Sequence, residues 1–214
     1  MGPEGSGLQF SENRQDYWVL DKVHYKKNGF FVDIGAGDGV TGSNTFALEK
    51  FYDWNGICID PNPSFLKSLC GSRDVLISDL AVWQTSGEIL DFKYIQQGRK
   101  DFFGWNFRSG ISSVVDNTLV KFDDHKVFSI TLNDLLELYN APKDIDYISI
   151  DAEGSETNIL ESFDFKKYNI KLFTIEYNDD NSRNAIRQIM EKNGYQAIDI
   201  DTSGEDRYIN IRSN

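Results

Sequence analysis

Short apolar runs that alternate with stretches of helical periodicity are the feature of this sequence that most constrains its fold. The runs are nearly continuous in β-branched and aromatic residues, which is typical of strands covered on both faces. Strands that alternate with helices predict an α/β fold with a mostly parallel sheet. The expected strands span residues 30–34, 56–60, 75–78, 147–151 and 172–177.

The end of the chain predicts two further strands, at residues 196–200 and 207–211, with a turn around Gly204 between them. Their close spacing favours an antiparallel hairpin. The expected sheet therefore has seven strands, and the last strand is antiparallel. Helices are expected after the cap residues 43–45, from Thr131 to a stop at Pro142, and over residues 181–193 before Gly194.

The length of 214 residues and a hydrophobic content of 40% predict a single domain with a substantial core. Residues 1–10 resemble a linker or tag, which leaves residues 11–214 as the domain. Residues 11–25 are expected to form a helix over one sheet edge. Residues 84–128 interrupt the alternation with a polar, aromatic-rich insertion that predicts a lid or an extra hairpin.

Charge and composition exclude several classes of partner. There are 22 Lys and Arg against 34 Asp and Glu, a net charge of −12 that repels phosphate backbones and disfavours nucleic acid. No apolar run approaches the ~20 residues that a membrane helix needs, so no membrane insertion is expected. The two cysteines, Cys58 and Cys70, lie in or beside apolar segments, which favours a reducing, cytoplasmic setting.

A glycine-rich loop follows the first expected strand, where residues 33–39 read Asp-Ile-Gly-Ala-Gly-Asp-Gly. Three glycines in five residues let the backbone turn tightly and approach a bulky ligand. A glycine-rich turn without a ligand is the alternative, which the flanking Asp33 and Asp38 disfavour. Val40 stands where the dinucleotide fingerprint has its third glycine, so the pattern fits NAD poorly.

Acids follow the next two expected strands. Asp60 stands where doubly wound folds place an acid on ribose hydroxyls, although it also suits the start of a helix. Asp79 and the backbone N–H of Leu80 suit the exocyclic amine and a ring nitrogen of adenine. In chain order, the glycine loop, Asp60 and Asp79 match the methionine, ribose and adenine parts of S-adenosylmethionine.

Several blocks of the sequence together resemble one known family. They are residues 29–39, 43–45, 48–50 and 54–63, and residues 150–156, which contain the pattern D-x-E-G-x-E. These blocks resemble FkbM-type methyltransferases, a branch of the class I S-adenosylmethionine-dependent enzymes. The resemblance implies a single-domain, Rossmann-like class I methyltransferase fold.

The resemblance also implies which residues hold the cofactor. Many members of that family carry Glu at the position of Asp60. The shorter Asp of this sequence still places a carboxylate there. The expected cofactor contacts are Asp33, Gly35, Ala36, Gly37, Ser43, Asn44, Asp60, Pro61, Asp79 and Leu80. Gln15 and Asp16, in a segment that also resembles the family, are expected to close over the cofactor.

The acceptor site is expected at the carboxyl ends of the strands, where Asp151 and Glu176 end two apolar runs. An unpaired charge there is costly, which favours a catalytic role for both. Glu153 is a third catalytic candidate, although an acid in the first turn of a helix also favours the helix dipole. One alternative is open: Asp151, Glu176 and Asn178 carry the oxygen ligands that suit Mg or Mn.

The aromatic insertion suits a carbohydrate, because sugar C–H faces stack on aromatic rings. A small hydrophobic cluster under a long loop explains the same residues equally well. The resemblance favours O-methylation of a sugar hydroxyl, free or in a glycan. His24, expected on the N-terminal helix, and His125, expected in a polar loop, are the other candidate bases.

Two other functions are compatible with parts of the pattern. An NAD-dependent sugar oxidoreductase or epimerase is suggested by the Tyr139-x-x-x-Lys143 spacing, but Pro142 breaks the helix that would align the pair. A non-catalytic binding module on the same fold is the second, since fold alone does not establish chemistry.

Overall fold

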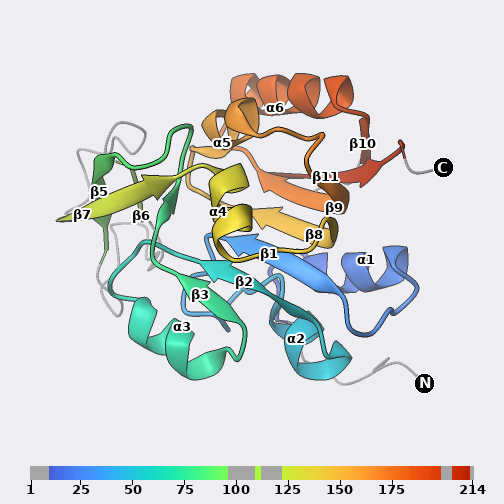
Figure 1. Cartoon of the computed structure of the whole chain (residues 1–214), viewed down its shortest axis with the longest axis horizontal. Helices are drawn as coiled ribbons and strands as arrows, with labels where there is room; N and C mark the ends of the chain where they lie inside the picture. The colour runs from blue at the N-terminus through green and yellow to red at the C-terminus, as the bar shows by residue number, and fades with distance from the viewer. Residues whose placement is uncertain (1–9, 96–108, 112–121, 199–203, 213–214) are drawn as a thin grey trace.

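The computed structural model describes residues 10–95, 109–111, 122–198 and 204–212. It is an α/β domain in which helices cover both faces of a central seven-stranded sheet (Figure 1). The strand order is β10-β11-β9-β8-β1-β2-β3. Its strands are β1 (Phe30–Ile34), β2 (Asn55–Ile59), β3 (Leu76–Ser78), β8 (Asp144–Ile150), β9 (Asn169–Glu176), β10 (Tyr195–Ile198) and β11 (Glu205–Asn210).

The topology confirms the predicted mostly parallel sheet. Strands β3, β2, β1, β8 and β9 pair in parallel, whereas β11 pairs antiparallel with both β9 and β10. β1 lies between β2 and β8, so the strand order reverses at β1. Ligands of such sheets bind outside the carboxyl ends of the strands at this reversal.

Two hydrophobic clusters explain why both faces of the sheet are covered. Val32 and Ile34 of β1 belong to one cluster, and Phe31, which precedes Val32, belongs to the other, as the alternation of side chains along a strand requires. The first cluster contains residues of α4 (Leu132–Leu138), α5 (Glu156–Ser162) and α6 (Asp180–Lys192); the second contains residues of α1 (Gln15–Lys22), α2 (Phe46–Tyr52) and α3 (Leu66–Ser72).

Hydroxyl side chains accept backbone N–H groups at the starts of α4 and α2. The hydroxyl of Thr131 accepts the N–H of Asp134 at 3.2 Å, which confirms the predicted cap of α4. At α2, one of the three cap residues expected from the sequence makes this contact. The Ser43 hydroxyl accepts the N–H of Phe46 at 3.1 Å, while the Thr45 hydroxyl points to Asp33 instead.

The predicted insertion contributes most of a second sheet with the order β4-β7-β5-β6, beside the main sheet (Figure 1). β5 pairs antiparallel with both β6 and β7, and β4 pairs in parallel with β7. Among the aromatic residues of the insertion, Phe92 and Tyr94 lie on β5, whereas those at positions 102, 103, 105 and 107 lie outside the described residues. The strands are β4 (Ala81–Val82), β5 (Ile89–Tyr94), β6 (Ser109–Ile111) and β7 (Asp123–Ile130).

Two sequence predictions for histidines are wrong. The predicted helix over residues 11–25 is shorter, because α1 ends at Lys22 and His24 lies in the following turn with φ 53°. His125 is exposed on strand β7 rather than in a loop, since β7 extends the pairing with β5 beyond the apolar residues. At the predicted linker boundary, the Phe10 ring packs on Phe46 with centroids 4.8 Å apart.

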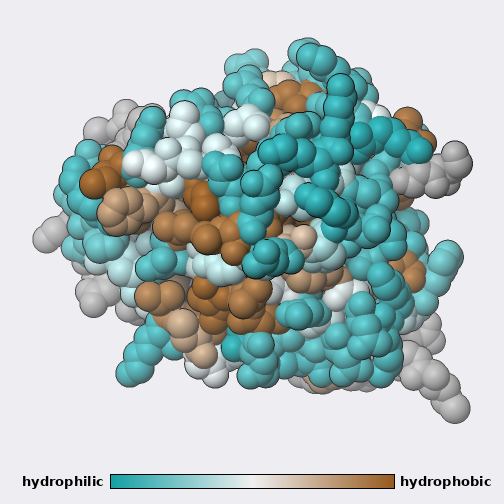
Figure 2. All heavy atoms as spheres, viewed as in Figure 1, coloured by the Kyte–Doolittle hydropathy of each residue, from teal (hydrophilic) through white to brown (hydrophobic). Residues whose placement is uncertain are grey.

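The surface is mostly hydrophilic on the face of Figure 2, with apolar residues gathered around α4 and β3. Cys58 is buried and Cys70 is exposed, and both are free thiols. Within the described ranges, no helix has the length and apolarity required to cross a membrane.

Candidate functional site

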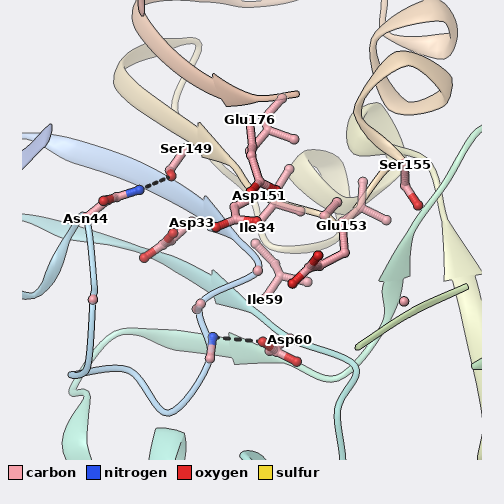
Figure 3. A pocket seen from close by; sticks show the side chains of 18 of the residues that line it. Asp33, Ile34, Asn44, Ile59, Asp60, Ser149, Asp151, Glu153, Ser155 and Glu176 are labelled. Atoms are coloured by element: carbon pink, nitrogen blue, oxygen red, sulfur yellow. Dashed lines mark hydrogen bonds between the residues drawn. The ribbon is translucent and has the colours of Figure 1, made fainter. Parts of the chain in front are cut away.

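A cavity of about 430 Å³ lies at the carboxyl ends of the central strands. The loops after β1, β2 and β8 and the end of β9 form its floor, the N-terminal segment lines one side, and the second sheet lines another. Figure 3 shows Asp151, Glu153 and Glu176 gathered near one another, with Asp60 across the open space. The cavity therefore coincides with the position predicted for the ligand.

The glycine loop is fixed against the neighbouring strands. The N–H groups of Gly35 and Ala36 both donate to the carbonyl of Ile59, at 2.9 and 3.0 Å. Gly35 has φ 85°, and Gly37 has φ 58°, a region that favours glycine. All three predicted loop contacts, Gly35, Ala36 and Gly37, line the cavity.

Asp60 is buried, with 6% of its surface exposed. One carboxylate oxygen accepts the N–H of Gly37 at 2.8 Å, and the other accepts the N–H of Asn62 at 2.8 Å. Burial raises the pKa of Asp60 to about 7. Because α3 begins only at Leu66, Asp60 does not cap that helix; it joins the glycine loop to the loop after β2. Pro61 beside it also lines the cavity.

Three further predicted contacts meet at the start of α2. Asp33 is buried and accepts the Thr45 hydroxyl at 2.5 Å; burial raises the pKa of Asp33. The Asn44 amide nitrogen donates to the Ser149 hydroxyl at 2.9 Å, as Figure 3 shows. The amide oxygen of Asn44 is buried and has no hydrogen-bond partner. Asp33, Ser43 and Asn44 all line the cavity, so this corner offers an acceptor to a ligand.

The structure does not bring the predicted adenine contacts into the cavity. Asp79 is exposed after β3, and the Leu80 N–H donates to the Ser78 hydroxyl at 3.3 Å. Neither residue is among those that line the cavity. Their role with adenine stays a prediction. Phe65 and Val82 line the cavity instead, and neither could be identified from the sequence, because both look like ordinary core residues.

The acids predicted for the acceptor site do converge. Asp151 directly follows β8, Glu176 is the last residue of β9, and both line the cavity with Glu153 and Asn178. Burial and the neighbouring Asp151 raise the pKa of Glu176, and burial raises that of Asp151. The two side chains share a hydrogen bond, which raises the pKa of Glu176 and lowers that of Asp151. Oε2 of Glu176 is buried without a partner.

Backbone strain marks the turn after Asp151. Glu153 has φ 53°, which is uncommon for a residue with a side chain and often occurs at functional sites. Glu156 holds this turn, because its carboxylate accepts the N–H groups of Ala152 at 2.8 Å and Gly154 at 3.1 Å. Glu156 is therefore structural, because it holds the turn that carries Glu153.

In the N-terminal segment, Gln15 and Asp16 make hydrogen bonds that could not be predicted from the sequence. Gln15 lines the cavity and donates to Glu205 at 2.7 Å, although the two residues are 190 positions apart. Asp16, expected beside it at the cofactor, accepts the Ser11 hydroxyl at 2.5 Å and does not line the cavity. Neither His24 nor His125 lines the cavity.

Two alternatives from the sequence are not supported by the structure: the Tyr139 and Lys143 pair of a dehydrogenase, and a site for Mg or Mn. The Tyr139 hydroxyl donates to the carbonyl of Ile77, and the Lys143 ammonium lies over the Tyr168 ring, so they do not form a dehydrogenase pair. Among the described residues, no three His, Cys, Asp or Glu side chains form a group that could hold a metal ion. The possible Mg or Mn site is therefore not supported.

The donors and acceptors of the cavity fit the expected cofactor. Gly37 leaves open space at the backbone, since a Cβ atom there would meet nothing within 4 Å; Asp60 offers a carboxylate to hydroxyls, and the side chain of Asn44 lines the same cavity. This set matches the ribose and methionine parts of S-adenosylmethionine.

Comparisons with known proteins agree with this site. The family model described as the methyltransferase FkbM domain matches residues 33–197. No curated protein matches the chain significantly. The precorrin-6y C5,15-methyltransferase of Geobacter metallireducens GS-15 is similar in structure, with a TM-score of 0.51 and 9% identity over 96% of this chain and 93% of that chain.

The METTL16 methyltransferase domain is also similar, with a TM-score of 0.50 and 10% identity over 90% of this chain and 64% of that chain. At such identities the likeness shows the fold alone, which is the Rossmann-like fold of class I methyltransferases. The family match covers more than half of the sequence, including the glycine loop, Asp60 and Asp151. The chain belongs to the FkbM methyltransferase family and is an S-adenosylmethionine-dependent methyltransferase.

Proposed function

We propose that the protein transfers the methyl group of S-adenosylmethionine to a hydroxyl of a sugar, free or within a glycan. The observation that carries the proposal is the group of acids Asp151, Glu153 and Glu176 beside the cofactor loop. A sugar presents several hydroxyl donors, and carboxylates are acceptors for them. The acids therefore suit a polyhydroxylated acceptor.

The chemistry requires alignment of the acceptor and removal of its proton. When bound, S-adenosylmethionine would supply a methyl group on a sulfonium: a positioned hydroxyl oxygen bonds to the methyl carbon in line, the C–S bond breaks to release S-adenosylhomocysteine, and the hydroxyl proton passes to a base. Asp151 is the proposed base, because its raised pKa makes the carboxylate a better proton acceptor near neutral pH. In this proposal the shared proton belongs to Glu176, whose pKa is raised by burial and by Asp151, so that Glu176 donates a hydrogen bond to Asp151 and holds it in place.

Charge favours an acceptor without phosphate. The described residues that line the cavity include seven acids and no Lys, Arg or His. A phosphate entering this space would meet carboxylates without a compensating cation. A neutral sugar avoids that cost. The seven acids are Glu12, Asp33, Asp60, Asp151, Glu153, Glu176 and Glu205.

The second sheet supplies an apolar surface opposite the acids. Phe92 of β5 and Ile111 of β6 face one another in register, and both are buried while lining the cavity. An aromatic ring at that position can contact the C–H face of a sugar.

The test is transfer of labelled methyl from S-adenosylmethionine to a panel of acceptors. The panel contains neutral monosaccharides and oligosaccharides, the matching sugar phosphates, an RNA and an unstructured peptide. We expect label in the neutral sugars, with less or none in the phosphates. Label only in RNA or peptide would overturn the sugar proposal. Binding of S-adenosylhomocysteine without turnover on any acceptor would favour the non-catalytic alternative.

A further inference from the structure

Arg73 is a buried cation beside the cofactor loop to which the sequence analysis gave no role. It follows α3 as the C-cap residue, and only 4% of its surface is exposed. Burying a guanidinium is costly unless its donors are satisfied. The contacts of Arg73 therefore indicate what it holds.

Those contacts are concentrated on the loop between β1 and α2. Nη1 donates to the carbonyl of Gly39 at 3.2 Å and to the Ser43 hydroxyl at 3.3 Å, and Nη2 donates to the Thr45 hydroxyl at 2.9 Å. Nε pairs with the carboxylate of Glu49 on α2. One planar donor group thus fixes three points of residues 39–45 relative to the helix that follows.

The loop also packs directly against the end of α3. Gly39 has φ 85°, and a Cβ atom there would lie 2.6 Å from the Ser72 hydroxyl and 2.9 Å from Cγ of Arg73. The Ser72 hydroxyl donates to the carbonyl of Asp38 at 3.1 Å. The last residues of α3 therefore form the outer support of the loop whose inner side lines the cavity.

A short hydrogen-bond chain connects Arg73 to the cavity. Arg73 donates to the Thr45 hydroxyl, and this hydroxyl donates to Oδ2 of Asp33 at 2.5 Å. Asp33 lines the cavity. The positive charge of Arg73 also opposes the burial that raises the pKa of Asp33. Arg73 thus influences both the orientation and the pKa of Asp33, although Arg73 itself does not line the cavity.

We infer that Arg73 is a positioning residue for S-adenosylmethionine, which acts through Thr45 and Gly39 to hold the cofactor loop and Asp33. The inference depends on the cofactor that the family uses and is independent of which acceptor is methylated. The alternative is a buried ion pair with Glu49 that stabilises the fold and has no effect on the ligand.

The experiment measures the affinity for S-adenosylhomocysteine by calorimetry and the thermal midpoint of unfolding for matched variants. Arg73→Met is compared with Arg187→Met, because Arg187 pairs with the buried Asp206 at 2.6 Å and does not line the cavity. We expect Arg73→Met to weaken binding by about 10- to 100-fold, the usual weight of hydrogen bonds to a charged group. Arg187→Met should lower the thermal midpoint and leave the affinity within about twofold.

A second pair of variants applies if Arg73→Met does not fold. Thr45→Val keeps the volume of a fully buried side chain and removes the hydroxyl that joins Arg73 to Asp33, whereas Thr45→Ser keeps that hydroxyl. We expect weaker binding in Thr45→Val, with a shifted pH dependence, and near wild-type behaviour in Thr45→Ser. Wild-type affinity in folded Arg73→Met, or in Thr45→Val, would overturn the inference.

Discussion

A Cβ atom placed on Gly35 would lie 1.8 Å from the carbonyl oxygen of Asp151. The glycine loop and the catalytic candidate are thus in direct backbone contact, where the N–H of Asp151 also donates to the carbonyl of Ile34 at 2.9 Å. A side chain at position 35 would force β1 and β8 apart at the strand reversal. The contact explains why the cofactor loop and the acid meet at one point.

Gly35→Ala should therefore destabilise the protein by about 2–4 kcal/mol, from overpacking and an unfavourable φ, and abolish binding of S-adenosylhomocysteine. Urea unfolding and calorimetry measure the two effects. Gly71→Ala is the control, because that glycine lies in α3 with open space around it. It should be neutral or stabilising by about 0.5–1 kcal/mol. A Gly35→Ala variant as stable as the wild type would contradict this account.

Glu156 gives the stability of the protein a pH dependence of defined sign. Burial raises its pKa from 4.5 to about 7. The folded state then binds this proton more tightly than the unfolded state, so the stability from this group is complete below about pH 4.5 and is lost as the pH rises toward 7.

Glu156→Gln keeps an acceptor oxygen but cannot titrate, so the loss of stability between pH 5 and 7.5 should shrink by about 1–3 kcal/mol. Urea unfolding at several pH values measures the difference. The exposed Glu161→Gln is the control and should behave as the wild type. Identical pH profiles for wild type and Glu156→Gln would show that Glu156 is ionised in both states.

Asp151→Asn should lower turnover by about 10²–10⁴-fold, the usual weight of one general base, while S-adenosylhomocysteine still binds. Glu176→Gln should cost less, because the amide can replace the neutral acid as a hydrogen-bond donor to Asp151. Steady-state kinetics with the acceptor found in the panel compares the two. Full activity in both variants would remove these acids from the mechanism.

Phe92→Leu should raise the KM for the acceptor by about 3- to 10-fold, as expected from the loss of an aromatic contact, with little change in cofactor affinity. The control is Phe128→Leu on the same small sheet, because Phe128 is 61% exposed. An unchanged KM, or a loss confined to cofactor binding, would show that β5 does not contact the acceptor.

The central sheet was predictable because its strands are apolar on both faces, so strand ends, and the acids Asp60, Asp151 and Glu176 beside them, could be located from sequence. An extra hairpin was one of two predictions for residues 84–128, but the full second sheet could not be predicted, because β4 has only two residues and β6 only three. Contacts between distant segments, such as Gln15 with Glu205 or Arg73 with Gly39, leave no local pattern in the sequence.

The most direct test of the site is a calorimetric titration of wild type and Asp60→Ala with S-adenosylhomocysteine at pH 8, with NAD as the comparison ligand. We expect one tight site for S-adenosylhomocysteine in the wild type and no binding of NAD. Asp60→Ala should lose about 1.5–3 kcal/mol of binding free energy, as expected when a charged acceptor of buried hydroxyls is removed. Circular dichroism verifies that Asp60→Ala is folded. Equal affinity in a folded Asp60→Ala, or tighter binding of NAD, would contradict the assignment of this cavity.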